Sequence, residues 1–154
     1  MNYCLERIHA TQEKDVYGIM MDVNCFKEIN DTYGHGAGDR AIQEIGHILS
    51  GALVANSVAI RMSGDEFMVL IRHGSKELLN KTCAAIEQRV QHYNATAPAG
   101  SFQLSFSTGV AKYEGGSVEK FLVELDERMY AEKRAFHAAR DGHAVPEQGN
   151  APSI

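Results

Sequence analysis

Apolar residues along the chain follow two different spacings. Four segments have the length or the alternation that is typical of strands: 16–21, 58–62, 67–71 and 102–112. Apolar residues that recur every three or four positions predict helices over five further segments: a weak one at 2–13, then 25–33, 41–53, 75–94 and 117–140. The run 143–154 has no such period and is predicted to be a flexible tail.

The order of these elements predicts the fold class. The strands 58–62 and 67–71 are joined by a short turn and must pair antiparallel. The two helices that follow 16–21 let this first strand lie beside the hairpin. We therefore expect one α+β domain over residues 1–142, with a central, mainly antiparallel sheet flanked by helices. A chain of 154 residues with 44% hydrophobic content suits one core rather than two.

Charge and cysteine content disfavour several classes of protein. The formal net charge is −5 and no basic stripe is interleaved with aromatic residues, so nucleic-acid binding is disfavoured. Cys4, Cys25 and Cys83 are widely spaced and form no Cys-x-x-Cys pair, which favours a reducing cytoplasm. No apolar stretch approaches the length of a membrane span, so we expect no membrane contact by this segment, while a membrane-bound parent protein stays open.

The turn of the predicted hairpin is acidic. In Met62-Ser63-Gly64-Asp65-Glu66-Phe67, two adjacent carboxylates lie at a tight corner, where like charges need solvent or a cation to offset them. Asp22 ends the first strand and is expected to approach this corner, with the main-chain oxygen of Val23 beside it. Such hard oxygen ligands suit Mg²⁺ or Mn²⁺ bound together with substrate phosphates. The ordinary alternative is an acidic turn that is merely solvated.

Other polar and aromatic candidates have ordinary explanations as well. Lys27 and Asp31 are spaced as an i,i+4 surface ion pair, and Asp39 follows the glycine-rich segment 34–38 as a helix N-cap would. These glycines lack the ending of a phosphate-binding loop and predict a turn. Phe26 is of a type more common in the core than against a nucleotide, and the seven histidines show no ligand spacing.

Three spaced blocks of the sequence resemble the diguanylate cyclase (GGDEF) family. They are Asp22-Val23-Asn24-Cys25-Phe26-Lys27-Glu28-Ile29-Asn30-Asp31, then Gly34-His35 with Gly38-Asp39, and then Arg61-Met62-Ser63-Gly64-Asp65-Glu66-Phe67. Ser107-Thr108-Gly109-Val110-Ala111 and the stretch from Asp126 to Lys133 resemble the family's later strand and closing helix. The resemblance covers residues 16–133 and implies a fold similar to the palm of nucleotide cyclases and polymerases.

The resemblance also implies an activity and a set of site residues. Members of the family join two GTP molecules into cyclic di-GMP with release of two pyrophosphates, in a homodimer in which each chain holds one GTP. By resemblance, Mg²⁺ or Mn²⁺ would be held by Asp22, the main-chain oxygen of Val23, and Asp65. The catalytic residues would be Asp65, Glu66 and Lys27. The substrate contacts would be Asn30 and Asp39 on guanine, with Phe26, Gly64, Lys133 and His137 around the rest of the nucleotide.

The chain departs from the family pattern in four places. Ser63 stands in place of the first signature glycine, and its Cβ either fits or crowds the nucleotide. Phe136 and His137 stand where the family usually has a glycine and a phosphate-binding arginine, with Arg134 as a differently oriented stand-in. The product-inhibition motif is missing, since residues 54–57 replace it, so no feedback through that site is expected. The family's opening motif is also absent, which predicts an excised domain whose sensor lay upstream.

Two classes of function remain open at this point. An active diguanylate cyclase is favoured because Asp22, Asp65 and Glu66 are all present. The alternative is a catalytically quiet GTP-binding module that regulates a partner domain by nucleotide occupancy. A purely structural domain would leave the acidic corner without a purpose, and a mononucleotide cyclase is disfavoured by the signature hairpin. In each case we expect a cytoplasmic domain, alone or as part of a larger protein.

Overall fold

A four-stranded antiparallel sheet forms the centre of the molecule. The computed structural model describes residues 5–6, 10 and 13–142. The strands are β1 (Val16–Val23), β2 (Ser57–Ser63), β3 (Glu66–Ile71) and β4 (Phe106–Tyr113). They are hydrogen-bonded in the order β2-β3-β1-β4, with every neighbouring pair antiparallel. The predicted α+β class is therefore confirmed, as is the placement of the first strand beside the hairpin.

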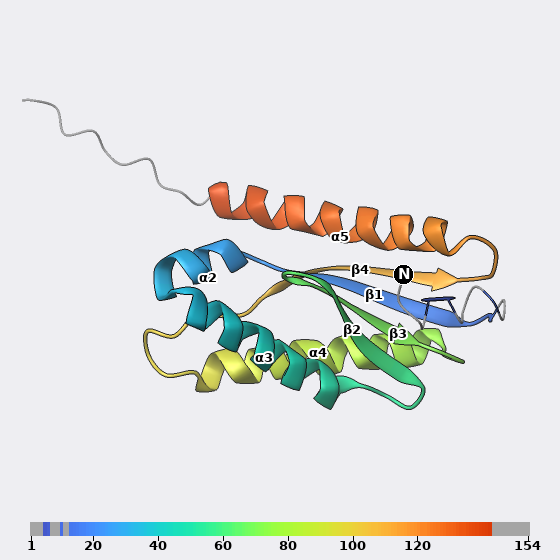
Figure 1. Cartoon of the computed structure of the whole chain (residues 1–154), viewed down its shortest axis with the longest axis horizontal. Coiled ribbons are helices and arrows are strands. Elements are labelled where there is room, and N and C mark those ends of the chain that lie inside the picture. Colours follow the sequence, from blue (N-terminus) through green and yellow to red (C-terminus); the bar gives the residue numbers. More distant parts are fainter. Residues whose placement is uncertain (1–4, 7–9, 11–12, 143–154) are drawn as a thin grey trace, which may run out of the picture.

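Between residues 13 and 142 the chain also forms four helices. They are α2 (Phe26–Tyr33), α3 (His35–Ala52), α4 (Lys76–Thr96) and α5 (Val118–Asp141). Helices α3 and α4 lie on one face and α5 runs along the other (Figure 1). Alternate residues of β1 face opposite sides of the sheet. Ile19 and Met21 pack in the core under α3 and α4, whereas Met20 packs in the core under α5. Asp22, next on the α5 side, therefore faces that last helix.

Helix α5 lies unusually close to the sheet. A Cβ added at Gly18 of β1 would lie 2.7 Å from Phe121 Cζ and 2.8 Å from Leu125 Cδ1. A Cβ at Gly109 of β4 would run into the main chain of α5 at Leu125 and Met129. These two glycines leave the space in which the helix sits, so the position of α5 over the end of β1 is fixed by shape.

The prediction of a turn over 34–38 with Asp39 as a helix cap is wrong. Only Gly34, with φ 84°, interrupts the helices, and α3 begins at His35. Asp39 therefore lies inside α3 rather than at its start. Gly38 is needed for another reason, since a Cβ there would collide with the Asn30 side chain across the α2–α3 contact. The glycines of this segment serve close helix packing as well as chain reversal.

The fourth strand is shorter than its alternating pattern predicts. Phe102 and Leu104 are buried as the alternation requires, but the strand begins only at Phe106. The Asn94 side chain of α4 accepts from the Leu104 N–H at 2.8 Å and donates to the Leu104 oxygen at 2.7 Å. A side chain thus takes the main-chain groups that a neighbouring strand would otherwise bind.

Two predicted terminal segments fall mostly or wholly outside the described residues. In the expected helix 2–13, the described Leu5, Glu6 and Ala10 are helical, and the expected tail 143–154 is not described. Within the described part of the chain, no helix is both long and apolar enough to cross a membrane.

Candidate functional site

The end of β1 meets the tip of the β2–β3 hairpin, as the sequence predicts. Asp22 lies opposite Glu66 in the strand register, and the Val23 N–H donates to the Asp65 oxygen at 3.1 Å. The tip itself is held by Arg61, whose guanidinium donates twice to the Gly64 oxygen, at 2.9 and 2.7 Å. Backbone pairing therefore brings the metal-ligand candidates Asp22, Val23 and Asp65 to one end of the sheet.

A partly buried ion pair joins this corner to α5. The Lys133 ammonium lies 2.7 Å from Asp22 Oδ1, and the Asp22 side chain is only 6% exposed. Burial raises the pKa of Asp22, and the charges of Asp65 and Glu66 add to that, against the lowering effect of Lys133. Burial alone would lower the pKa of Lys133, but its hydrogen bond to Asp22 and the surrounding carboxylates raise it. Lys133 therefore carries its positive charge into the acidic corner.

Ser63 contacts one of the predicted catalytic carboxylates. Its hydroxyl donates to Glu66 Oε2 across the tip of the hairpin. Ser63 is exposed and Glu66 half-buried, so this hydrogen bond lies at the solvent-facing side of the acidic corner. The residue that departs from the family signature thus orients Glu66, an effect that glycine could not have.

The side chains at the corner are not gathered into a ready metal cluster. Among residues 5–6, 10 and 13–142, no group of three or more histidine, cysteine, aspartate or glutamate side chains is placed to hold a metal ion. The three carboxylates share this corner as expected, but their side chains have other partners: Asp22 is paired with Lys133 and Glu66 with Ser63. The oxygen donors nevertheless suit Mg²⁺, since two carboxylates and a main-chain oxygen are its preferred ligand types and substrate phosphates can complete the set.

The predicted guanine contacts come together where α2 packs on α3. Asn30 is half-buried, donates to the Phe26 oxygen at 3.4 Å and lies against Gly38. Asp39 follows Gly38 on α3 and is exposed, as is Lys27 on α2. Phe26 is half-buried and packs against the core under α3 and α4, which is its ordinary role. An amide and a carboxylate are thus close enough in the fold to serve one ligand.

The last turns of α5 lie over the start of α2 (Figure 1). His137 is half-buried and close enough to Glu28 to lower its pKa, although the larger cause is the hydrogen bond from Arg140. Arg140 donates to Glu28 Oε1 at 2.7 Å and to Cys25 Sγ at 2.6 Å. Arg134 points elsewhere, since its guanidinium lies 4.8 Å from the centre of the Tyr130 ring. Sequence reasoning missed Arg140, although its spacing of seven residues from Lys133 was available as a signal.

Asn24 fixes the segment that joins β1 to α2 and was also missed. Its side chain donates to Ser105 Oγ at 3.2 Å and accepts from Ser107 Oγ at 2.6 Å, and its N–H donates to the Ser105 oxygen at 2.9 Å. Asn24 is 4% exposed and Ser107 fully buried. This anchor holds the main chain at Val23 against β4.

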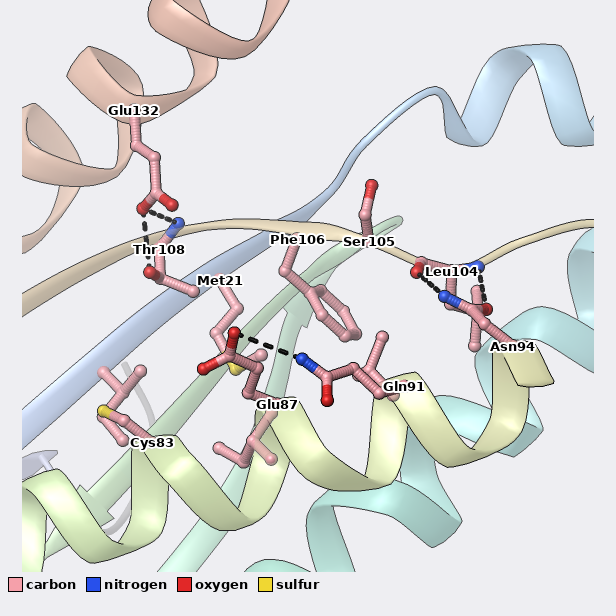
Figure 2. Close-up of a pocket in the computed structure, with 13 residues that line it drawn as sticks. Met21, Cys83, Glu87, Gln91, Asn94, Leu104, Ser105, Phe106, Thr108 and Glu132 are labelled. Atoms are coloured by element: carbon pink, nitrogen blue, oxygen red, sulfur yellow. Dashed lines mark hydrogen bonds between the residues drawn. The ribbon is translucent and has the colours of Figure 1, made fainter.

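A cavity of about 430 Å³ lies away from this corner, between α4 and β4. Figure 2 shows Cys83, Glu87 and Gln91 of α4 on one side and Thr108 with Glu132 on the other. None of the predicted metal, catalytic or nucleotide residues lines it. The corner formed by Asp22, Asp65 and Lys133, not this cavity, is therefore the candidate site.

Comparison with known proteins identifies the family. A family model described as "Diguanylate cyclase, GGDEF domain" matches residues 2–138. The chain belongs to the diguanylate cyclase GGDEF domain family.

Among curated proteins, the chain is similar to two from Escherichia coli. It is 31% identical over 118 residues to the diguanylate cyclase DosC, covering 75% of this chain and 26% of that protein. It is 36% identical over 131 residues to the probable diguanylate cyclase DgcI, covering 84% of this chain and 28% of that protein. The chain thus spans about a quarter of the length of these curated relatives.

Solved structures agree with the fold. The GGDEF domain of YfiN from Pseudomonas aeruginosa matches with a TM-score of 0.70 and 27% identity, covering 85% of this chain and 83% of that one. The GGDEF domain of DgcB from Caulobacter crescentus, in complex with c-di-GMP, matches with a TM-score of 0.75 and 24% identity, covering 85% and 81%. The expected fold of the family is therefore confirmed.

Proposed function

We propose that this domain is a diguanylate cyclase, which condenses two GTP molecules into cyclic di-GMP and releases two pyrophosphates. The observation that carries the proposal is the meeting of Asp22, the Asp65–Glu66 hairpin tip and Lys133 at one end of the sheet. Carboxylates that accept protons or hold Mg²⁺, next to a cation that neutralises phosphate, are the groups that nucleotidyl transfer needs.

Each half of the reaction transfers one nucleotidyl group. The 3′-oxygen of one GTP forms a bond to the α-phosphorus of the other, the bond from that phosphorus to the bridging oxygen of pyrophosphate breaks, and the hydroxyl proton passes to a carboxylate. Glu66, with Asp65 beside it, is the proposed acceptor, and Lys133 and Lys27 offset the charge on the phosphates. Bound Mg²⁺ (or Mn²⁺), held by Asp22, Asp65 and the Val23 oxygen, supplies activation of the hydroxyl and further neutralisation of phosphate charge.

Guanine recognition is assigned to the contact between α2 and α3. Asp39 accepts from the ring N–H and the exocyclic amine, and Asn30 offers an amide to the same edge. His137 is assigned to the phosphates, and Gly64 would let the main chain pass close to the nucleotide. Phe26 supports this segment from the core side.

The reaction requires two copies of the domain. Each copy binds one GTP, so two domains must meet face to face, at least transiently, for the two nucleotides to react with each other. We further propose a cytoplasmic location, where GTP is available, and a parent protein whose upstream sensor controls this meeting.

The test is incubation of concentrated protein with GTP and Mg²⁺ or Mn²⁺, with products resolved by chromatography and mass spectrometry. Asp65→Asn is the matched control because it keeps the size of the side chain and removes its charge. Cyclic di-GMP from the wild type and not from the variant is the expected result.

A second candidate function, a quiet GTP-binding module, is favoured by one observation, the pairing of Asp22 with Lys133 and of Glu66 with Ser63 in place of an open cluster. Metal-dependent GTP binding by calorimetry, without product even when a fused dimerising segment is added, would decide for the quiet module.

A further inference from the structure

Three basic side chains follow one face of α5 toward its end. Lys133, His137 and Arg140 are spaced by four and then three residues, which places them on the same side of a helix. From Lys133 to Arg140 the helix rises about 10 Å. The basic groups on this face of α5 are therefore spread along the helix and not gathered at one position.

Both ends of this face contact the segment between β1 and α2. Lys133 reaches Asp22 at the end of β1, and Arg140 reaches Cys25 and Glu28 at the start of α2. Figure 1 shows the end of α5 lying over this junction. Lys27 and Lys133, the proposed triphosphate contacts, lie on the two helices that meet here, and Arg140 lies beyond Lys133 along α5.

The chemistry of the three cations differs. A guanidinium is always charged and presents several N–H donors in a planar fork that matches phosphate oxygens, whereas histidine carries charge only when protonated. Arg134 is engaged with the Tyr130 ring on another side of α5. Among the residues of α5 near the start of α2, Arg140 is thus the one suited to replace the phosphate-binding arginine that His137 displaces.

We infer that Arg140 binds the terminal phosphates of GTP, and that Glu28 occupies the same guanidinium when no nucleotide is present. The inference rests on the proposed GTP-binding function and names a substrate contact that the family pattern does not predict. The Arg140–Glu28 pair has exposed side chains, 46% and 59%, so it is weak in water and easily exchanged. A triphosphate carries more negative charge than one carboxylate, so it replaces Glu28 at the Arg140 guanidinium.

Calorimetry with a non-hydrolysable GTP analogue (β,γ-imido) and with GMP, both in Mg²⁺, tests the exchange without requiring turnover. Arg140→Ala should weaken binding of the analogue by about tenfold or more and leave GMP binding unchanged. Glu28→Gln should tighten binding of the analogue by about twofold to fivefold, because the competing carboxylate is gone. In the double variant this gain should vanish. Arg134→Ala is the matched control and should match the wild type.

The sign of the Glu28→Gln effect separates this role from a purely structural one. If the Arg140–Glu28 contact only held α5 in place, both variants would weaken binding of the analogue, and the inference would be wrong. Unchanged binding in Arg140→Ala would also overturn it, as would a wild type that binds no analogue. Arg140→Lys, followed by thermal unfolding, replaces Arg140→Ala if that variant does not fold, and an intermediate affinity is then expected. The absence of cyclic di-GMP with intact analogue binding would refute only the proposed cyclase.

Discussion

The two halves of α5 contact the sheet in different ways. In the first half, Phe121, Leu125 and Met129 are buried in apolar contact with Gly18 and Gly109. The exposed Arg128 adds a hydrogen bond from this half to the Val110 oxygen of β4. In the second half, the contacts are polar and reach residues on β1, β4 and α2: Lys133 to Asp22, Glu132 to Thr108 and Arg140 to Glu28. The difference indicates that one half holds the helix on the fold and the other supplies charge to the site.

The largest effect is expected from Gly109→Ala, which disturbs the packing of the first half of α5 on β4. The added Cβ would meet main-chain atoms of Leu125 and Met129, which cannot move without lifting α5. We expect a loss of about 3 kcal/mol in the free energy of unfolding, measured by urea denaturation. Gly46→Ala is the matched control, since a Cβ there has nothing within 4 Å, and it should stabilise slightly. Equal stability of the two variants would refute close packing at Gly109.

Lys133→Met is expected to have the next largest effect and acts on the polar half. It leaves the buried Asp22 carboxylate without its cation, at a cost of about 2 kcal/mol near neutral pH. The pKa of Asp22, already raised by burial, should rise further because the lowering effect of Lys133 is lost. Carbon-13 NMR titration of the Asp22 carboxyl group would measure this directly.

The pH dependence of this variant has a definite sign. A carboxyl whose pKa is higher in the folded than in the unfolded state contributes stability that is fully present below the unfolded value of 3.8 and is lost as pH rises through the folded pKa. Lys133→Met extends that window upward. The difference in stability from the wild type should therefore shrink as the solution is acidified, and a constant difference across pH would contradict the ion pair.

Val123→Ala should have the smallest effect and sharpens the comparison within the first half. Val123 lies on the same stretch of α5 as the buried residues but is 55% exposed. Its truncation should change the unfolding free energy by no more than about 0.5 kcal/mol and leave GTP binding untouched. A larger loss would mean that this exposed side of α5 is covered in solution, which sedimentation at increasing protein concentration would reveal.

Most of the fold could be predicted because it depends on local pattern. The four strands and the hairpin follow from apolar spacing, and the approach of Asp22 to the hairpin tip follows from antiparallel pairing. The errors arise where a distant side chain decides local structure. Gly38 leaves room for the Asn30 side chain inside a helix contact, so this glycine does not mark the predicted turn. The Asn94 side chain binds the main chain of Leu104, where the predicted strand would otherwise have begun.

The candidate site shows the same division. Residues within one segment, such as Asp65 and Glu66, could be placed from the sequence, and the resemblance named Lys133. No local pattern pairs Arg140 with Glu28 or Asn24 with Ser107, because these contacts join residues 112 and 83 positions apart. Whether the assigned residues act as proposed stays a prediction for the binding and product measurements.

The ion pair between Lys133 and Asp22 also has a consequence for folding. Its partners are 111 residues apart, and Arg140 lies still later in the chain. Contacts of such long sequence separation form slowly, after shorter-range structure has collapsed. During synthesis, the sheet strands and α2 can emerge from the ribosome and pair before α5 does, since α5 follows them all. The acidic corner therefore lacks Lys133 until α5 has packed on the sheet, and the proposed nucleotide binding is expected only after this last step of folding.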